Sequence, residues 1–102
     1  MIMMKIMVEV KSSKQKEFFQ AIRSLKSSRK THNGLRKLSF YQEIDNPESF
    51  SLIYEWDAWE DMDVYLGEEE FRVLRGAIKV LGENSVISFM HISKEDVSTE
   101  RY

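Results

Sequence analysis

The stretch Phe50–Gly82, FSLIYEWDAWEDMDVYLGEEEFRVLRGAIKVLG, decides the fold of this chain. It opens with Phe50–Trp56, in which large apolar side chains occupy every second position, the period of a half-buried strand. Asp57, with Glu60 three residues later, predicts a capped helix start, and Gly67 predicts a break in that helix. Beyond the break, apolar residues recur at helical spacing and predict a second, longer helix: Phe71, Leu74, Ile78 and Leu81.

The segments on either side supply the remaining elements. Residues 2–10 alternate between apolar and mixed positions, which predicts a strand. A helix should follow, begun by a capping box of Ser12 and Gln15 and continuing to about Arg29 or Lys30. Two further strands are predicted over Leu35–Ile44 and Ser85–Ser93.

The predicted order is therefore strand, helix, strand, strand, broken helix, strand. This is the ferredoxin-like α+β arrangement, βαββαβ, in which a four-stranded antiparallel sheet carries its helices on one face. The chain has 102 residues, of which 42% are hydrophobic and one is proline, as expected for a single domain. We place the domain at residues 1–93 and interpret residues 94–102 as a polar C-terminal tail.

One layer of helices leaves the second face of the sheet uncovered. Strand alternation assigns Ile87, Phe89 and His91 to that face, which would also carry several apolar residues from other strands: Met3, Met7, Tyr41 and Ile53. We predict a homodimer formed through the face that bears Tyr41, Ile53 and Phe89, because a partner subunit would cover it.

Composition excludes several functional classes. The net charge of −2 argues against a nucleic-acid partner, and the lack of cysteine excludes disulfides, thiolate metal sites and thiol nucleophiles. The N-terminus has neither a basic leader nor a long apolar run, so we expect no membrane association and a cytoplasmic location. Basic residues gather in Lys11–Lys37, nine against the single acid Glu17, a pattern that usually marks a solvated face and sometimes an anion site.

Three segments in this order carry a family resemblance. They are Glu55-Trp56 at a strand end, EFRVL at Glu70–Leu74 and GAI at Gly76–Ile78, and Asn33-Gly34 stands where a glycine turn is common. The chain resembles the antibiotic biosynthesis monooxygenase family of dimeric α/β-barrel proteins over nearly its whole domain, Met3–Ile92.

The resemblance implies a homodimer whose two sheets face each other as a barrel, with a pocket between the sheet and the helices of each subunit. Several members of the family oxidise electron-rich aromatics such as quinols or anthrones with O₂ and no bound cofactor, and a related branch degrades haem. Because one fold hosts several activities, the resemblance alone does not fix the reaction.

Five residues form the site that the resemblance implies. Trp56 would line the pocket and stack on an aromatic substrate, although a large core aromatic is the alternative interpretation. Tyr65 would donate from its phenol to a substrate oxygen, the alternative being a boundary tyrosine with its hydroxyl in water. The expected substrate-binding wall comprises Trp59, Phe71 and Leu74, around a mostly apolar cavity beside the Gly67 break.

This sequence departs from the family pattern at informative positions. Members often carry histidine where this chain has Tyr65, and the polyketide-oxidising type has asparagine where this chain has Leu52. Haem-degrading members ligate iron through a helix histidine. Here, the histidines are His32, expected to be a solvated turn residue, and His91, expected at the dimer interface or in solvent, so no haem and no other cofactor is predicted.

The acidic residues indicate helix starts better than they indicate a metal site. Asp61, Asp63 and the run Glu68–Glu70 lie where helix N-termini favour negative charge, and we predict no bound metal. Three functions stay open: a cofactor-independent monooxygenase for a small aromatic, a non-catalytic dimeric module that binds a small apolar ligand, and a dimer that serves protein association.

Overall fold

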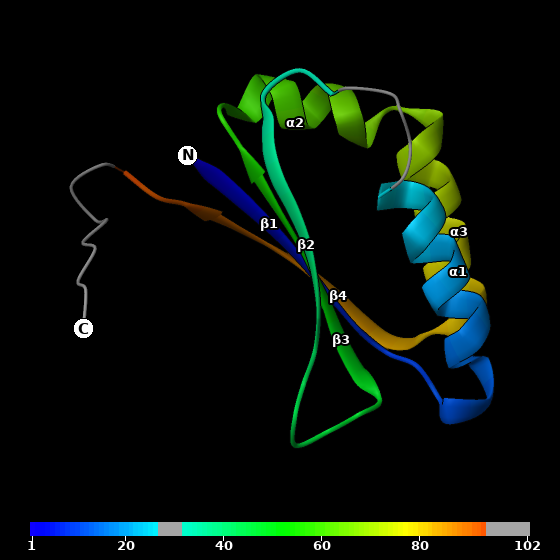
Figure 1. Ribbon diagram of the computed structural model, residues 1–102. Helices are drawn as coiled ribbons and strands as arrows, with labels where there is room; N and C mark the ends of the chain where they lie inside the picture. Colours follow the sequence, from blue (N-terminus) through cyan, green and yellow to red (C-terminus); the bar gives the residue numbers. More distant parts are fainter. Residues whose placement is uncertain (27–31, 94–102) are drawn as a thin grey trace.

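The structure is a computed structural model that describes residues 1–26 and 32–93. Helices pack on one face of a four-stranded antiparallel sheet of order β2-β3-β1-β4 (Figure 1). This confirms the ferredoxin-like α+β prediction. The elements are β1 (Ile2–Glu9), the 3₁₀ helix η1 (Ser12–Lys14), α1 (Gln15–Lys26), β2 (Leu35–Gln42), β3 (Ser49–Trp56), α2 (Trp59–Leu66), α3 (Glu69–Leu81) and β4 (Glu83–His91).

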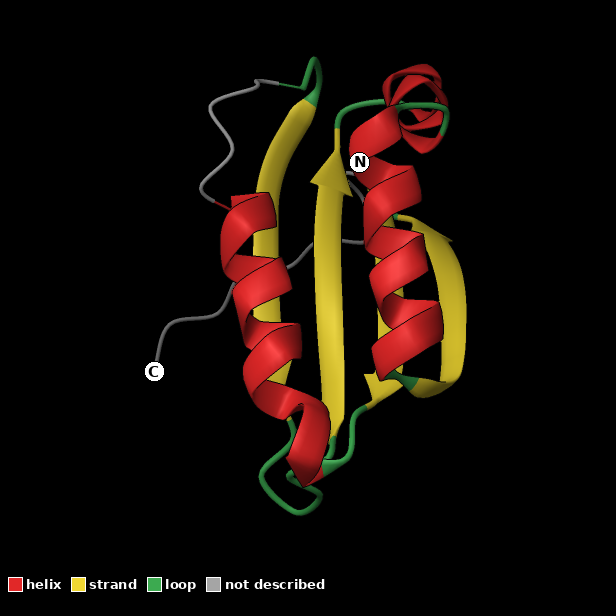
Figure 2. Ribbon diagram, turned by 90° about the vertical axis from the view of Figure 1, so that its right-hand side faces the viewer, coloured by secondary structure: helices red, strands yellow, loops and turns green. Residues whose placement is uncertain are grey.

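The helices form a single layer. Figure 2 shows α1 and α3 lying side by side across the sheet, with α2 at the end where β3 finishes. The break between α2 and α3 occurs at Gly67, as predicted. The predicted end of the first helix at Arg29 or Lys30 and the predicted tail 94–102 lie outside the described residues. Within the described part of the chain, no helix has the length and apolar character needed to cross a membrane.

The core lies between this helical layer and the two central strands. The alternation seen in the sequence is confirmed, because every second residue of β1 and β3 is buried toward the helices: Ile2, Met4, Ile6, Val8, Phe50, Leu52, Tyr54 and Trp56. The helices contribute Phe18, Ile22, Met62, Tyr65, Phe71, Leu74 and Ile78. Burying each large apolar side chain contributes about 1.5–3 kcal/mol, so this layer is the main source of stability.

Both predicted capping boxes are wrong, because the polar side chains make longer-range contacts instead. Ser12 lies inside η1, and Gln15 Nε2 donates to the carbonyls of Val10 at 3.0 Å and Pro47 at 3.2 Å. Ala58, not Asp57, is the N-cap of α2. The Asp57 carboxylate accepts a hydrogen bond from Arg36 at the start of β2. Gln15 thus connects the start of α1 to the segment after β1 and to the turn before β3, and Asp57 connects the segment before α2 to β2.

The facing of β4 also differs from the prediction. Ile87 pairs with Ile6, Phe89 with Met4, and His91 with Ile2. Directly paired residues share a sheet face, so all three β4 residues lie on the helix side and not on the outer face. Alternation could not reveal this, because β4 carries apolar residues on both faces.

The facing of β4 is set by its register on β1, which shifts between Met7 and Glu9. Asn84, at φ 51°, lies in the left-handed region beside this irregularity. Val86 and Met90 therefore occupy the outer face in place of Ile87 and Phe89.

Phe71→Ala and Leu74→Ala should each destabilise the fold by about 2–5 kcal/mol, because each removes a buried side chain and leaves a cavity. Chemical denaturation measures the free energy of unfolding. Val73→Ala is the matched control on the exposed side of the same helix and should change stability by less than about 0.5 kcal/mol. Losses below about 1 kcal/mol for both core variants would show that α3 is not packed as described.

Candidate functional site

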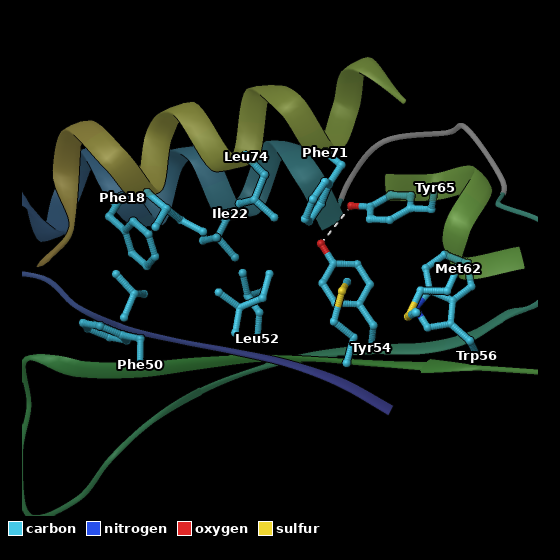
Figure 3. Packing of buried hydrophobic residues seen from close by; sticks show 14 of the residues in the cluster. Phe18, Ile22, Phe50, Leu52, Tyr54, Trp56, Met62, Tyr65, Phe71 and Leu74 are labelled. Atoms are coloured by element: carbon cyan, nitrogen blue, oxygen red, sulfur yellow. Dashed lines mark hydrogen bonds between the residues drawn. The ribbon is translucent and has the colours of Figure 1, made fainter. Parts of the chain in front are cut away.

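A buried pair of tyrosine hydroxyls joins the sheet to the helical layer. Tyr54 points from β3 and Tyr65 from the last turn of α2, and their hydroxyl oxygens are 2.8 Å apart (Figure 3). The side chains are almost fully buried, with ring centroids 5.3 Å apart. Buried hydroxyls need partners, and each of these tyrosines supplies the partner of the other.

The surroundings keep both hydroxyls protonated. Burial raises the pKa of Tyr65 to about 12, the nearby Glu70 carboxylate adds to the rise, and the hydrogen bond from Tyr54 opposes it. Burial raises the pKa of Tyr54 further still, well above its ordinary value, and the neighbouring Tyr65 adds to the effect. Both phenols are therefore neutral at physiological pH. Because one hydroxyl hydrogen is used between them, the pair has one hydrogen left to donate to a bound oxygen atom.

His32 belongs to this site, which corrects its assignment as a solvated turn residue. Its side chain is only 7% exposed, and its Nε2 lies 2.5 Å from Glu70 Oε2. Its Nδ1 lies 3.1 Å from Glu68 Oε2, within ion-pair distance but without hydrogen-bond alignment. The imidazole meets the Tyr65 ring edge-on, with centroids 4.7 Å apart. No local pattern could reveal these contacts, because His32 and its carboxylates are far apart in sequence.

The turn that carries His32 is held against α2. Asn33 Nδ2 donates to Asp61 Oδ1 at 3.1 Å, and the Asp57 amide donates to the Gly34 carbonyl at 2.8 Å. Gly34 has φ 78°, and a side chain there would collide with Asp61. Glycine is therefore required on both conformational and steric grounds. Asp61, which was interpreted as a helix-start residue, therefore also holds the His32 turn in place.

A cavity of about 200 Å³ lies beside the hydroxyl pair. Its walls come from all three α-helices, from β2 and β3, and from the His32 turn: Leu25, Lys26, His32, Leu35, Leu38, Tyr54, Tyr65 and Glu70. Polar groups line one part and leucines the rest, the usual make-up of a small-molecule site. Such a cavity can hold a small ring that carries an oxygen substituent. Within the described residues, no three His, Asp or Glu side chains are arranged to hold a metal ion.

The structure brings only part of the predicted site to this cavity. Tyr65 lines it, whereas Trp56 packs behind the wall, with its ring 5.2 Å from that of Tyr65. Phe71 lies behind Tyr65 as well, at 5.5 Å between ring centroids. Leu74 lines a separate groove between α1 and α3. The cavity therefore opens on the β2 side of Tyr65, away from the corner where it was predicted.

Trp59, which was expected in the substrate-binding wall, does not face the cavity. Its side chain is 42% exposed and lies against Phe89, with ring centroids 6.1 Å apart. The corner near Trp56 is filled instead by the Trp56 ring itself and by Met62, which is buried. The Trp56 indole N–H is buried without a hydrogen-bond acceptor among the described residues.

Solved structures share this fold at low sequence identity. A conserved protein from Methanosarcina mazei Go1 is 22% identical, with 90% of this chain and 92% of that chain covered and a TM-score of 0.82. Rv0793 from Mycobacterium tuberculosis is 10% identical, with coverages of 94% and 98% and a TM-score of 0.81. A structure described as an antibiotic biosynthesis monooxygenase is 16% identical, with coverages of 91% and 99% and a TM-score of 0.79.

The comparison with curated proteins found no match. The comparison with protein families found one: the family described as antibiotic biosynthesis monooxygenase matches residues 1–76. These residues extend from β1 through most of α3 and include His32, Tyr54, Tyr65 and Glu70. The chain belongs to the antibiotic biosynthesis monooxygenase family.

Proposed function

We propose that this chain is a cofactor-independent monooxygenase that oxidises a small electron-rich aromatic of the quinol or anthrone type. The observation that carries the proposal is the buried Tyr54–Tyr65 hydroxyl pair, which opens onto a cavity of about 200 Å³. Membership of the family supports the class of reaction.

The residues around the cavity supply the three functions that the reaction needs: a hydrogen-bond donor, a proton acceptor and exclusion of water. One hydroxyl hydrogen is used within the Tyr54–Tyr65 pair. The other is donated to the substrate oxygen, on which negative charge develops. The His32–Glu70 pair accepts the proton that the substrate gives up. Leu25, Leu35 and Leu38 keep water away from the reactive anion, which favours its reaction with O₂.

The overall reaction balances without an added reductant: one substrate and one O₂ give one oxygenated product and one water. Loss of a proton leaves a carbanion, which reduces O₂ and forms a carbon–oxygen bond. The resulting peroxide takes up a proton. Its O–O bond then breaks as the same carbon loses its remaining hydrogen as a proton, leaving a carbonyl group and water. The substrate supplies all the electrons.

The purified chain should consume O₂ with 1,8-dihydroxyanthrone in the presence of a chelator, faster than the uncatalysed autoxidation. Tyr65→Phe should lower kcat/KM by about tenfold or more, because it removes one hydrogen-bonding hydroxyl from the site. Val64→Ala is the control on the exposed side of the same helix, since Val64 is 66% exposed. An oxygen electrode gives both rates. No rate above autoxidation, or equal rates for Tyr65→Phe and Val64→Ala, would count against the proposal.

A non-catalytic module that binds a small apolar ligand is the second candidate. One observation favours it: Leu52, which replaces the asparagine of the polyketide-oxidising type, is buried and adds no polar group to the site. The same assay separates the two functions. Binding of the anthrone without oxygen uptake would support the module.

A homodimer through the outer sheet face is part of the proposal. Apolar or aromatic side chains with substantial exposure gather there: Met7, Tyr41, Val86 and Met90. Ile53 lies on the same face, whereas Phe89, which was predicted to join it, lies on the helix side. An apolar face of this kind favours self-association.

Light scattering at micromolar concentration should give the mass of a dimer. Val86→Asp should shift the mass toward the monomer without unfolding the chain, because a buried unpaired charge weakens an interface strongly. Val64→Asp introduces the same charge on the exposed side of α2 and should leave the dimer intact. A monomer mass for the unmodified chain would contradict the dimer.

A further inference from the structure

A second and larger hollow lies between α1 and the edge strand β2. Its volume is about 670 Å³, and it is lined by Phe19, Ile22, Arg23, Lys26, Phe40, Gln42 and Phe50. Phe40 and Phe50 stack with ring centroids 5.5 Å apart and planes 10° apart. Phe19 meets both rings edge-on, at 6.1 and 5.4 Å. Phe50 is buried, so the partly exposed rings of Phe19 and Phe40 supply the aromatic surface that a flat ligand could pack against.

This aromatic groove and the tyrosine cavity follow the same pair of strands. Leu38 pairs with Tyr54, and two residues along β2, Phe40 pairs with Leu52. These residues share the helix face of the sheet, so they form one continuous floor. Lys26, in the last turn of α1, lines both the groove and the cavity. The two hollows are therefore neighbours that share Lys26.

The groove is positively charged. Arg23 and Lys26, one turn apart on α1, both line it, whereas no acidic residue does. Neither cation has an ion-pair partner among residues 1–26 and 32–93. By contrast, Lys11 and Arg36, from the same basic segment of the sequence, pair with Glu83 and Asp57. Two unpaired cations beside an apolar wall favour an anionic group on a ligand.

We infer that Arg23 and Lys26 form an acid-binding subsite, and that the natural ligand is a hydroxyaromatic acid. Its hydroxyl lies at Tyr54 and Tyr65, its ring system extends past Leu38 toward Phe40, and its carboxylate meets the two cations. This inference rests on the proposed function only in using the same tyrosine cavity. It requires no catalytic step, so equilibrium binding tests it.

The test compares 6-hydroxy-2-naphthoate with its methyl ester, which has the same rings and hydroxyl but no charge. Isothermal titration at low salt should show the acid binding about tenfold more tightly than the ester. Arg23→Gln combined with Lys26→Gln should abolish this difference by weakening the acid alone. Arg72→Gln combined with Lys79→Gln removes two cations from α3, outside this groove, and should preserve the difference.

The outcomes separate this inference from the proposed function. Equal affinities for acid and ester would overturn the acid-binding subsite and leave the cavity in place. A preference for the acid that survives loss of Arg23 and Lys26 would place the carboxylate elsewhere and also overturn it. Failure of both compounds to bind would overturn the shared tyrosine cavity, and the proposed function with it.

Discussion

The hydrogen bond between Tyr54 and Tyr65 is the interaction on which the rest of the site depends. It connects the central strand β3 to the end of α2, where the helical layer breaks at Gly67. Without a partner, each buried hydroxyl would cost about 1–3 kcal/mol, so the two residues hold the sheet and the broken helix at a fixed separation. The cavity lies beside this connection, on the side that faces β2 and His32.

The charged side chains around the tyrosine pair come from distant parts of the chain. His32 comes from the turn before β2, Glu68 and Glu70 from the start of α3, and Lys26 from the end of α1. Each of these residues lies where a helix or strand begins or ends. The fold brings these helix and strand ends together beside the tyrosine cavity. The acid–base groups lie on one side of the cavity and the neutral hydroxyl pair on the other, which is the arrangement that the proposed oxidation of an ionising aromatic would need.

Sequence patterns correctly predicted the features of the fold that depend on local periodicity. The alternation in Phe50–Trp56 and the break at Gly67 gave the strand and the divided helix, because burial imposes those periods on the chain. Sequence patterns did not predict the features that depend on contacts between distant segments. The facing of β4 follows from its register on β1, and the burial of His32 follows from its contacts with α3. Gln15 looked like the partner of Ser12 in a capping box, and Asp57 looked like an N-cap, because capping and long-range contacts use the same side chains.

A double-mutant cycle on Tyr54 and Tyr65 tests the central claim most directly. Tyr54→Phe, Tyr65→Phe and the double variant are unfolded by denaturant, and the three losses in free energy are compared with the unmodified chain. If the two hydroxyls bond each other as described, each single variant strands a buried partner, and the double variant loses less than the sum of the single losses, by about 0.5–3 kcal/mol. Strictly additive losses would contradict the account.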